Sequence, residues 1–264
     1  MNPESTMRPA IFVTGAASGI GRACAEHFAR RGWFVGLYDL NVAGVTALAR
    51  ELGDRHCSFG ALDVTDPDAW NRALGAFWSA SGQRLDVLLN NAGVLTTGPF
   101  EAVPLTQHAA MLDVNVRGLL TGCHAAFPYL RRTADARVIN MASATAIYGQ
   151  PELATYSATK FAVRGLTEGL DLEWSRYGIR VSAVWPSFVS TPMAASFGHI
   201  ASARSLGIRL TADHVARVVW ACAHRRRWLH KTHWVVGLQA WLLALGTRYA
   251  PAPLTRGIVR LLTR

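Results

Sequence analysis

A glycine-rich stretch near the start of the chain constrains the fold more than any other feature. Residues 14–21 read TGAASGIG and lie between an apolar run and a segment with helical spacing at 20–31. Gly15, Gly19 and Gly21 let the backbone turn sharply, let phosphate oxygens approach, and let a helix begin close to a sheet. Their spacing differs from the general Gly-x-Gly-x-x-Gly dinucleotide fingerprint. The stretch is therefore either a phosphate-binding turn or a purely structural one.

Apolar runs and segments with helical spacing alternate along the chain. The predicted strands cover residues 10–13, 33–38, 57–62, 85–89, 137–141, 179–185 and 234–236. The predicted helices cover residues 20–31, 42–52, 66–78, 105–127, 156–177 and 211–223. Such alternation, with strands apolar enough to be buried on both faces, indicates an α/β fold with a doubly wound parallel sheet.

The positive charge of the chain is concentrated in its last quarter. The net charge is +10, and residues 201–264 contain 11 of the 27 basic residues but only one of the 17 acidic ones, Asp213. This distribution, with leucines interleaved among the arginines, favours lipid or protein contact over nucleic-acid binding. We therefore expect no nucleic-acid partner.

Cysteine usage and the first residues indicate the compartment. The four cysteines are scattered without short spacing, and the four histidines after residue 213 lack metal-ligand spacing, so neither a disulfide framework nor a metal site is expected. The first ten residues lack the long apolar core of a signal peptide. We expect a cytoplasmic protein.

Polar residues follow six successive predicted strands. In a doubly wound sheet, ligands bind at the carboxyl ends of the strands. Each of these positions taken alone could simply cap or turn a loop, but together they mark one edge of the sheet as a binding site. The positions are the glycine turn, Asp39, Asp63, residues 91–93, Ser143 and residues 186–191.

Asp39 bears on the choice of cofactor. It lies at the end of the second predicted strand, near the spacing from the glycine turn at which a carboxylate meets an adenosine ribose. A carboxylate there accepts hydrogen bonds from the ribose hydroxyls and repels a 2′-phosphate. Because Arg22 lies just beyond the turn and is expected to face solvent or a carboxylate, Asp39 predicts NAD rather than NADP.

Tyr156 and Lys160 lie four residues apart on one predicted helix and so share a face. A tyrosine with a pKa of about 10 is a poor base at neutral pH, but a neighbouring ammonium stabilises the phenolate. Lys160 is the only lysine before residue 201. The alternative, an ordinary surface pair, is therefore disfavoured.

Together these residues resemble the short-chain dehydrogenase/reductase family, in its classical branch. The resemblance spans residues 14–191. It implies a single Rossmann-type domain with about seven parallel strands and helices on both faces, a nicotinamide cofactor, and hydride transfer between an alcohol and a carbonyl. The motifs that carry it are TGAASGIG at 14–21, Asp39, LDV at 62–64, NNAG at 90–93, DVNV at 113–116, MAS at 141–143, YSATK at 156–160, and Pro186 with Thr191.

The resemblance implies a role for each of four catalytic residues. Tyr156 would exchange a proton with the substrate oxygen, and Ser143 would position that oxygen. Lys160 would lower the pKa of the tyrosine and bind the nicotinamide ribose. Asn115 matches an asparagine at a helix kink, whose backbone would hold a water that connects the lysine to solvent.

The resemblance also implies a set of cofactor-binding residues. Asp63 and Val64 would frame the adenine, and Val189 and Thr191 would contact the nicotinamide amide. The family usually has Pro-Gly where this chain has Pro186-Ser187, and a serine fits that turn only if its φ stays negative. The full set is Gly15, Ser18, Gly19, Ile20, Gly21, Asp39, Asp63, Val64, Asn91, Ala92, Gly93, Tyr156, Lys160, Val189 and Thr191.

Residues 225–264 depart from the family pattern. We expect a catalytic NAD-binding domain at 1–224 and a basic, amphipathic extension at 225–264 that packs on or near it. The apolar run at 234–245 is too short to span a bilayer, which needs about 20 residues. It suits either a helix on an anionic membrane surface or a segment that packs over the substrate cleft or a partner subunit.

The predicted function is NAD-dependent hydride transfer with a lipophilic alcohol or ketone such as a steroid, terpenoid or long-chain alcohol. A mobile lid is expected at 191–210, carrying Met193, Phe197, Ile200, Leu206 and Ile208. The alternatives are an NADPH-dependent ketoreductase of acyl-type carbonyls and a non-catalytic, membrane-docking nucleotide-binding protein. The resemblance also implies a homotetramer or homodimer formed through the helices at 105–127 and 156–177.

Overall fold

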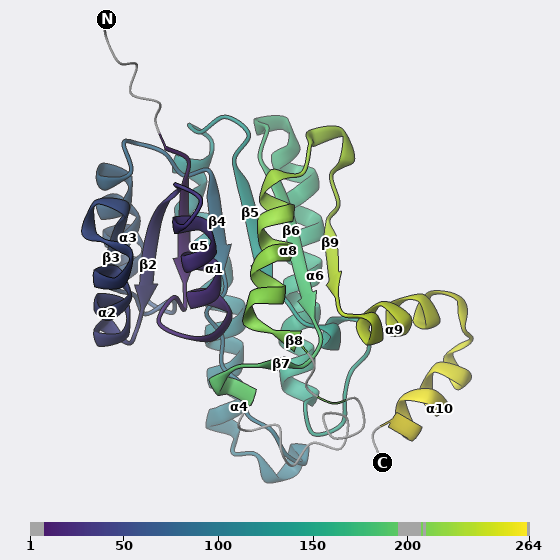
Figure 1. Ribbon diagram of the computed structural model, residues 1–264. Coiled ribbons are helices and arrows are strands. Elements are labelled where there is room, and N and C mark those ends of the chain that lie inside the picture. Colours follow the sequence, from purple (N-terminus) through teal and green to yellow (C-terminus); the bar gives the residue numbers. More distant parts are fainter. Residues whose placement is uncertain (1–7, 195–206, 208–209, 263–264) are drawn as a thin grey trace, which may run out of the picture.

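The computed structural model describes residues 8–194, 207 and 210–262, and it has a seven-stranded parallel sheet at its centre (Figure 1). The strand order is β3-β2-β1-β4-β5-β6-β9. A two-stranded ribbon, β7 (Val189–Ser190) with β8 (Leu210–Thr211), lies apart from it. The central strands are β1 (Ala10–Thr14), β2 (Phe34–Asp39), β3 (Cys57–Ala61), β4 (Val87–Asn90), β5 (Arg137–Met141), β6 (Arg180–Pro186) and β9 (His233–Val236).

Helices cover both faces of this sheet and create two separate cores. On one face α1 packs beside α8, and on the other α3 packs beside α5 and α4 beside α6. Side chains alternate between the faces, so that Phe12 belongs to one core while Ile11 and Val13 belong to the other. The helices are α1 (Gly19–Ala29), α2 (Val42–Leu52), α3 (Pro67–Ala80), α4 (Leu105–Leu112), α5 (Leu119–Leu130), α6 (Ala154–Trp174), α8 (Ala212–His224), α9 (Leu238–Tyr249) and α10 (Ala252–Leu262).

The predicted fold class is confirmed, and one predicted helix is corrected. The helix expected at 105–127 is interrupted by a π-helical turn at Asp113–Gly118, and its second half continues past Pro128 to Leu130. A proline inside a helix removes one hydrogen bond and crowds the carbonyl four residues earlier. Pro128 and His124 are both exposed, so water can take that carbonyl and the helix continues.

The last strand of the sheet comes from the 225–264 segment. The strand predicted at 234–236 is confirmed as β9, which pairs in parallel with β6. Asp171 on α6 anchors the approach to it, accepting hydrogen bonds from His230 Nε2 at 2.9 Å and Thr232 Oγ1 at 3.2 Å. Beyond β9, α9 and α10 extend to one side of the domain (yellow in Figure 1). None of the described helices is both long and apolar enough to cross a membrane.

Candidate active site

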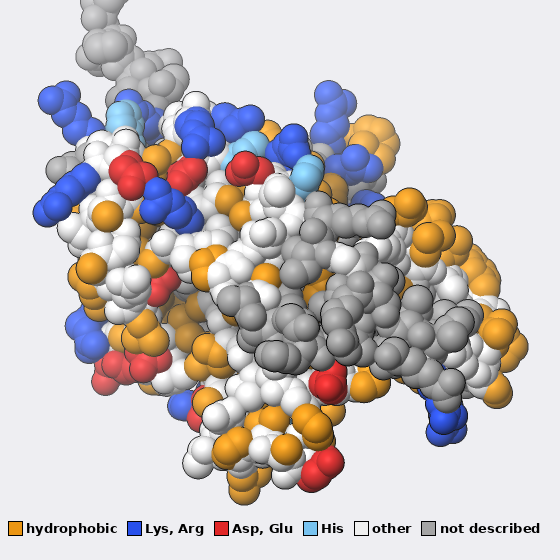
Figure 2. Space-filling view, turned by 60° about the horizontal axis from the view of Figure 1, so that its bottom comes forward, with side chains coloured by type: hydrophobic (Ala, Val, Ile, Leu, Met, Phe, Trp, Pro, Cys, Tyr) orange, Lys and Arg blue, Asp and Glu red, His pale blue; other side chains and the backbone are white. Residues whose placement is uncertain are grey.

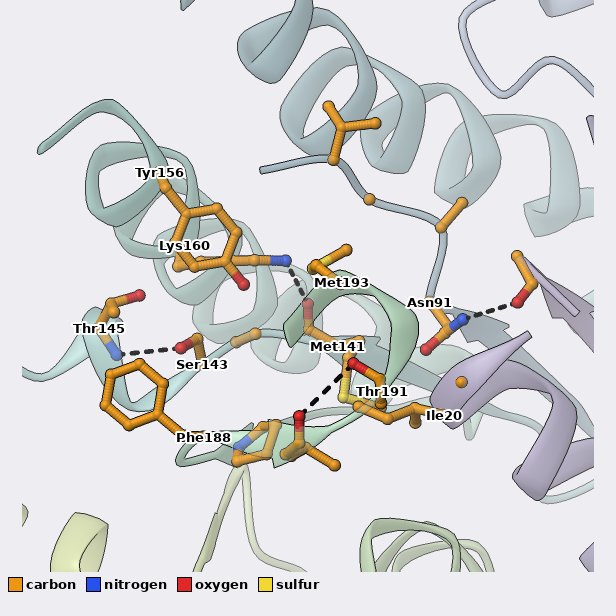
Figure 3. Close-up of a pocket in the computed structure, with 18 of the residues that line it drawn as sticks. Ile20, Asn91, Met141, Ser143, Thr145, Tyr156, Lys160, Phe188, Thr191 and Met193 are labelled. Carbon is orange, nitrogen blue, oxygen red and sulfur yellow. Dashed lines mark hydrogen bonds between the residues drawn. The ribbon is translucent and has the colours of Figure 1, made fainter. Parts of the chain in front are cut away.

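A cavity of about 400 Å³ lies at the carboxyl edge of the central sheet (Figure 3). It is lined by the segments that follow β1 to β6, the edge at which polar residues predicted a binding site. Of the predicted site residues, all line this cavity except Gly21 and Asn115. Those two lie behind its wall.

The glycine turn has the geometry of an anion-binding helix terminus. Gly15 and Gly19 have positive φ values of 67° and 55°, and a Cβ at Gly21 would collide with the Gly15 carbonyl oxygen. Helix α1 begins at Gly19, and Ser18 at its N-cap forms no side-chain capping bond. The first turn holds no acidic residue. Its N–H groups are therefore available to a phosphate, which fits the pyrophosphate of a dinucleotide.

Asp39 is held at the end of β2, facing this turn. Its carboxylate accepts hydrogen bonds from the backbone N–H groups of Ala17 at 3.0 Å and Asn41 at 2.9 Å. Arg22 pairs with Glu26 and Glu51, away from the cavity, as expected for a residue that faces carboxylates. Of the described residues that line the cavity, only Lys160 is cationic. The described part of the lining therefore offers no positive charge to pair with a 2′-phosphate beside Asp39.

The turn after β4 is hydrogen-bonded to the end of β1, where the glycine turn begins. The Asn91 side chain donates to the Thr14 carbonyl at 2.9 Å, and the backbone N–H groups of Asn91 and Ala92 both donate to Thr14 Oγ1 at 3.0 Å. On the neighbouring loop, Asp63 Oδ1 accepts from the N–H and hydroxyl of Thr65. These bonds hold the cavity-lining loops after β1, β3 and β4 in place.

Asn115 supports the site from behind. It lies in the π-helical turn, where its Oδ1 accepts from Val94 N at 2.8 Å and its Nδ2 donates to Val94 O at 2.9 Å. The same Nδ2 donates to Thr159 Oγ1 at 3.2 Å, next to Lys160. The asparagine side chain therefore ties the loop after β4 to the helix that carries Tyr156 and Lys160.

Ser143, Tyr156 and Lys160 converge inside the cavity (Figure 3). Ser143 follows β5, and its hydroxyl accepts from the N–H of Thr145 at 3.2 Å. Lys160 Nζ donates to the Met141 carbonyl at 2.9 Å and lies 5.4 Å from the centroid of the Tyr156 ring. An ammonium at this distance interacts favourably with an aromatic face.

Burial shifts the pKa values of Tyr156 and Lys160. Burial raises the pKa of Tyr156 to about 12, and the nearby Ser143 hydroxyl only partly opposes that rise. Burial lowers the pKa of Lys160 to about 8. Burial dominates the pKa of Tyr156, and the Lys160 ammonium donates to the Met141 carbonyl. That Lys160 lowers the pKa of the tyrosine during catalysis stays a prediction.

An apolar wall lines part of the cavity. Leu153 and Phe188, which the sequence analysis did not single out, pack with Tyr156, and α9 and α10 contribute Leu243 and Val259. Residues of the tail therefore line the cavity. The sequence of α9 contains a signal for this packing. Its apolar residues occur on all sides of the helix, so more than one face must pack against other residues.

The described part of the loop after β6 has the backbone conformation that Ser187 requires. Ser187 does not adopt a positive φ, so the serine fits where the family has glycine. Val189, Thr191 and Met193 line the cavity. The other proposed lid residues, Phe197, Ile200, Leu206 and Ile208, lie outside the described residues.

Comparisons with known proteins agree with this geometry. The family model described as short chain dehydrogenase matches residues 9–200. D-threitol dehydrogenase of Mycolicibacterium smegmatis is 37% identical over 184 residues, which cover 69% of this chain and 70% of that protein. The 3-alpha-(or 20-beta)-hydroxysteroid dehydrogenase of Mycobacterium bovis is 37% identical over 182 residues, covering 69% of each chain.

A solved structure shares the fold over most of the chain. The 3-ketoacyl-(acyl-carrier-protein) reductase of Brucella melitensis, solved in complex with NADH, superposes with a TM-score of 0.80 at 27% identity, covering 88% of this chain and 98% of that one. The chain therefore belongs to the classical short-chain dehydrogenase/reductase family. It is an oxidoreductase of a family that uses a nicotinamide cofactor, acts on small molecules and is generally oligomeric.

Proposed function

We propose that this protein is an NAD-dependent oxidoreductase that transfers a hydride between nicotinamide and a secondary or primary alcohol, or the corresponding ketone or aldehyde, of a hydrophobic substrate. The observation that carries the proposal is the convergence of Ser143, Tyr156 and Lys160 in a mostly apolar cavity that begins at an open helix N-terminus. NAD, when bound, supplies the hydride acceptor.

The chain's own residues would hold the cofactor along the carboxyl edge of the sheet. The N–H groups at the start of α1, with Gly15, Ser18, Gly19, Ile20 and Gly21, would bind or frame the pyrophosphate. Asp39 would accept from the adenosine ribose, and Lys160 would donate to the nicotinamide ribose. Around these groups, Asp63 and Val64 would frame the adenine, Asn91, Ala92 and Gly93 would line the channel, and Val189 and Thr191 would contact the nicotinamide amide.

Proton exchange would take place at the Tyr156 hydroxyl. During reduction the tyrosine would give its proton to the substrate oxygen, and during oxidation it would take the proton of the alcohol. With a pKa of about 12, Tyr156 of the free protein is in its proton-donating form. Oxidation therefore depends on the Lys160 ammonium to stabilise the phenolate, with Ser143 and Asn115 positioning the oxygen and the lysine.

The acyl-carbonyl alternative differs in its cofactor. The superposing reductase is named for a 3-ketoacyl substrate but was solved with NADH, so it supports the substrate of this alternative and not its cofactor. An NADPH-dependent enzyme of that kind would need a cation for the 2′-phosphate, and the Asp39 carboxylate disfavours it. Turnover that requires NADPH would favour this alternative.

The substrate is proposed to be lipophilic because Leu153 and Phe188 pack with Tyr156, and Leu243 and Val259 line the same cavity. The named relatives act on a polyol and on steroids, so the panel that tests the proposal contains both classes. It consists of hydroxysteroids, terpenoid alcohols, aliphatic secondary alcohols and tetritols, each with NAD, monitored by the absorbance of the reduced nicotinamide. Turnover of the lipophilic alcohols supports the proposal. Turnover of the tetritols alone would contradict the substrate class, and binding of NAD without any turnover would favour the non-catalytic alternative.

Two surfaces are proposed to make contacts beyond the active site. Helices α4, α5 and α6 expose large apolar side chains, and we propose them as the interface of a homodimer or homotetramer; these side chains are Leu112, Leu120, Phe161 and Leu172. The outer face of α9 exposes a second set, visible on the right in Figure 2, where α9 and α10 lie: Leu238, Trp241, Leu242 and Leu245.

The partner proposed for the α9 face is an anionic membrane surface. The chain has no acidic residue after Asp213, and Arg256 and Arg260 on α10 are exposed. Basic and apolar groups together suit anionic lipid headgroups. Sedimentation with phosphatidylglycerol vesicles but not with phosphatidylcholine vesicles, abolished by Trp241→Gln and unaffected by Phe59→Gln on the opposite edge strand, is expected. No sedimentation with either vesicle would contradict the contact.

A further inference from the structure

Two polar side chains in the wall of the cavity carry oxygen atoms that form no hydrogen bond. Thr145 is 6% exposed and Gln150 is 9% exposed, and both line the cavity. Thr145 Oγ1 and Gln150 Oε1 are shielded from bulk water and have no partner among the described residues. Both lie between Ser143 and Tyr156 in the sequence, yet hydride transfer as proposed above uses neither.

The backbone around these side chains is well satisfied. Thr145 N donates to Ser143 Oγ, Gln150 N donates to Ser157 Oγ at 3.2 Å, and Leu153 N donates to the Gln150 carbonyl. The segment is therefore held in place, and the unmet hydrogen-bonding capacity is confined to the two side-chain oxygens. An unpaired buried polar group destabilises a fold, and native proteins contain few of them. Of the seven buried side-chain atoms without a partner among the described residues, these two belong to residues that line the cavity, where a ligand can supply the missing hydrogen bonds.

The surroundings would make such a ligand contact selective. Figure 3 shows Thr145 beside Ser143, near Phe188 and at the same end of the cavity as Tyr156. Most other side chains that line the cavity are apolar, including Leu153 and Leu243. Hydrogen bonds are stronger in such an environment than in water, and a few placed polar groups in an apolar pocket fix the orientation of a ligand.

We propose that Thr145 and Gln150 form a second polar subsite, which binds a neutral hydroxyl or carbonyl group of the substrate other than the oxygen that reacts at Tyr156. A hydroxyl and an amide can each donate and accept, which matches either group. The terminal torsion of glutamine is soft, so its amide can turn toward a bound group. The proposal rests on the proposed function and sharpens it: the substrate is an apolar skeleton with two oxygen functions.

The separation of the two oxygen functions follows from the fold. Thr145 is two residues from Ser143 and its N–H is bonded to the Ser143 hydroxyl. A group bound at Thr145 is therefore only a few carbon atoms away from the oxygen at Ser143. Both polar groups belong to one end of the substrate, and the apolar remainder lies against the wall built from Leu153 and the tail helices.

Diols of graded spacing test this subsite. The probes are a secondary decanol and its analogues with a second hydroxyl two, four or six carbons from the reacting one, each assayed with NAD. The expected result is a kcat/KM for the best diol at least about tenfold above that of the decanol, because the subsite is left unpaired by the single alcohol. Thr145→Val and Gln150→Met should each remove most of that preference and leave kcat/KM for the decanol within about twofold.

Thermal unfolding distinguishes this role from a structural one. Because neither oxygen has a partner, Thr145→Val and Gln150→Met should leave the Tm of the free protein unchanged or raise it. Thr167→Val is the matched control: Thr167 is fully buried outside the cavity, and its hydroxyl bonds Val163 and Asn140. This control should lower Tm and leave the diol preference unchanged.

Three results would overturn the subsite: no diol preferred by the unmodified enzyme, a preference that survives both substitutions, or a Tm loss in Thr145→Val as large as that in Thr167→Val. Absence of turnover with the decanol and every diol would instead contradict the substrate class of the proposed function. The Tm comparison then decides the subsite alone, with an unchanged or raised Tm supporting it.

Discussion

Lys160 is a buried ammonium whose pKa, about 8, lies well below that of a lysine in water. An unfolded lysine has a pKa of about 10.4. Between these two values the unfolded chain binds a proton that the folded protein has released, so the contribution of Lys160 to stability rises with pH across that window. Below about pH 8 the folded protein holds a desolvated charge, which opposes folding.

Lys160→Met is therefore expected to stabilise the free protein while removing activity. The gain near pH 7 should be about 1–3 kcal/mol, reduced by the loss of the bond to the Met141 carbonyl, and it should shrink as the pH approaches 10. Thermal unfolding of both proteins across this pH range measures it. A variant that is less stable than the unmodified protein near pH 7 would contradict the electrostatic account.

Asp39→Asn tests cofactor choice because it keeps the size of the side chain and removes its charge. The amide oxygen can still accept from Ala17 or Asn41, so the turn should persist. We expect the ratio of the Kd values for NADP and NAD to fall by at least about tenfold, since the repulsion of the 2′-phosphate is removed. Calorimetric titration with both cofactors measures this ratio, and an unchanged ratio would place the selectivity elsewhere.

At the residue scale, the sequence predicts the motif positions well and the substrate wall poorly. Asp39, Ser143, Tyr156 and Lys160 could be placed because each has a characteristic partner at a fixed spacing. Gln150 has no such signature, because its location depends on the path of the segment between β5 and α6. The pKa of Tyr156 was also unpredictable, since desolvation is a property of the packed site.

At the scale of elements, the attachment of the tail depends on α6. Burial raises the pKa of the Asp171 carboxyl. Hydrogen bonds from His230, the Val181 N–H and Thr232 outweigh this effect, so the pKa is lowered overall. A depressed carboxyl pKa stabilises the folded state above the unfolded value of about 3.9, and that stability is lost as the pH falls below it. Asp171 therefore joins α6, β6 and the approach to β9 most firmly near neutral pH.

Asp171→Asn should lower the stability near pH 7 by about 1–3 kcal/mol, because the amide replaces a charged acceptor. The difference should narrow below about pH 4, where the carboxyl of the unfolded chain becomes protonated while the native one, with its lower pKa, still holds its charge. Denaturant unfolding at both pH values measures the difference. Glu173→Gln on the exposed side of the same helix is the control and should have little effect, whereas an equal loss in both variants would contradict the anchoring role.

The elements themselves show what periodicity can and cannot predict. Strand and helix order followed from the alternation of apolar runs, because a buried parallel strand must be apolar throughout. Periodicity alone did not predict the π-helical turn at 113–118, because it depends on Asn115 bonding a distant loop; only the family resemblance implied a kink at this residue. The covering role of α9 depends on where β9 leaves the sheet.

At the scale of the whole molecule, the two exposed apolar surfaces give distinguishable assemblies. If α4, α5 and α6 form the subunit interface, then Leu120→Glu or Leu172→Glu should convert the oligomer to smaller species, since a buried unpaired carboxylate opposes association. Leu245→Glu on α9 should leave the mass unchanged. Light scattering after size-exclusion chromatography measures this, and dissociation by Leu245→Glu alone would assign the interface to the tail.

The central claim is that the cavity performs hydride transfer with Tyr156 as its proton donor and acceptor. The most direct measurement compares the unmodified protein with Tyr156→Phe, using NAD and an alcohol that the unmodified protein oxidises, together with the Kd for NAD. Turnover by Tyr156→Phe should fall by about 10²-fold to 10⁴-fold, because the exchangeable proton is removed. The Kd for NAD and the Tm should remain nearly unchanged. Turnover of the variant close to that of the unmodified protein would contradict the account.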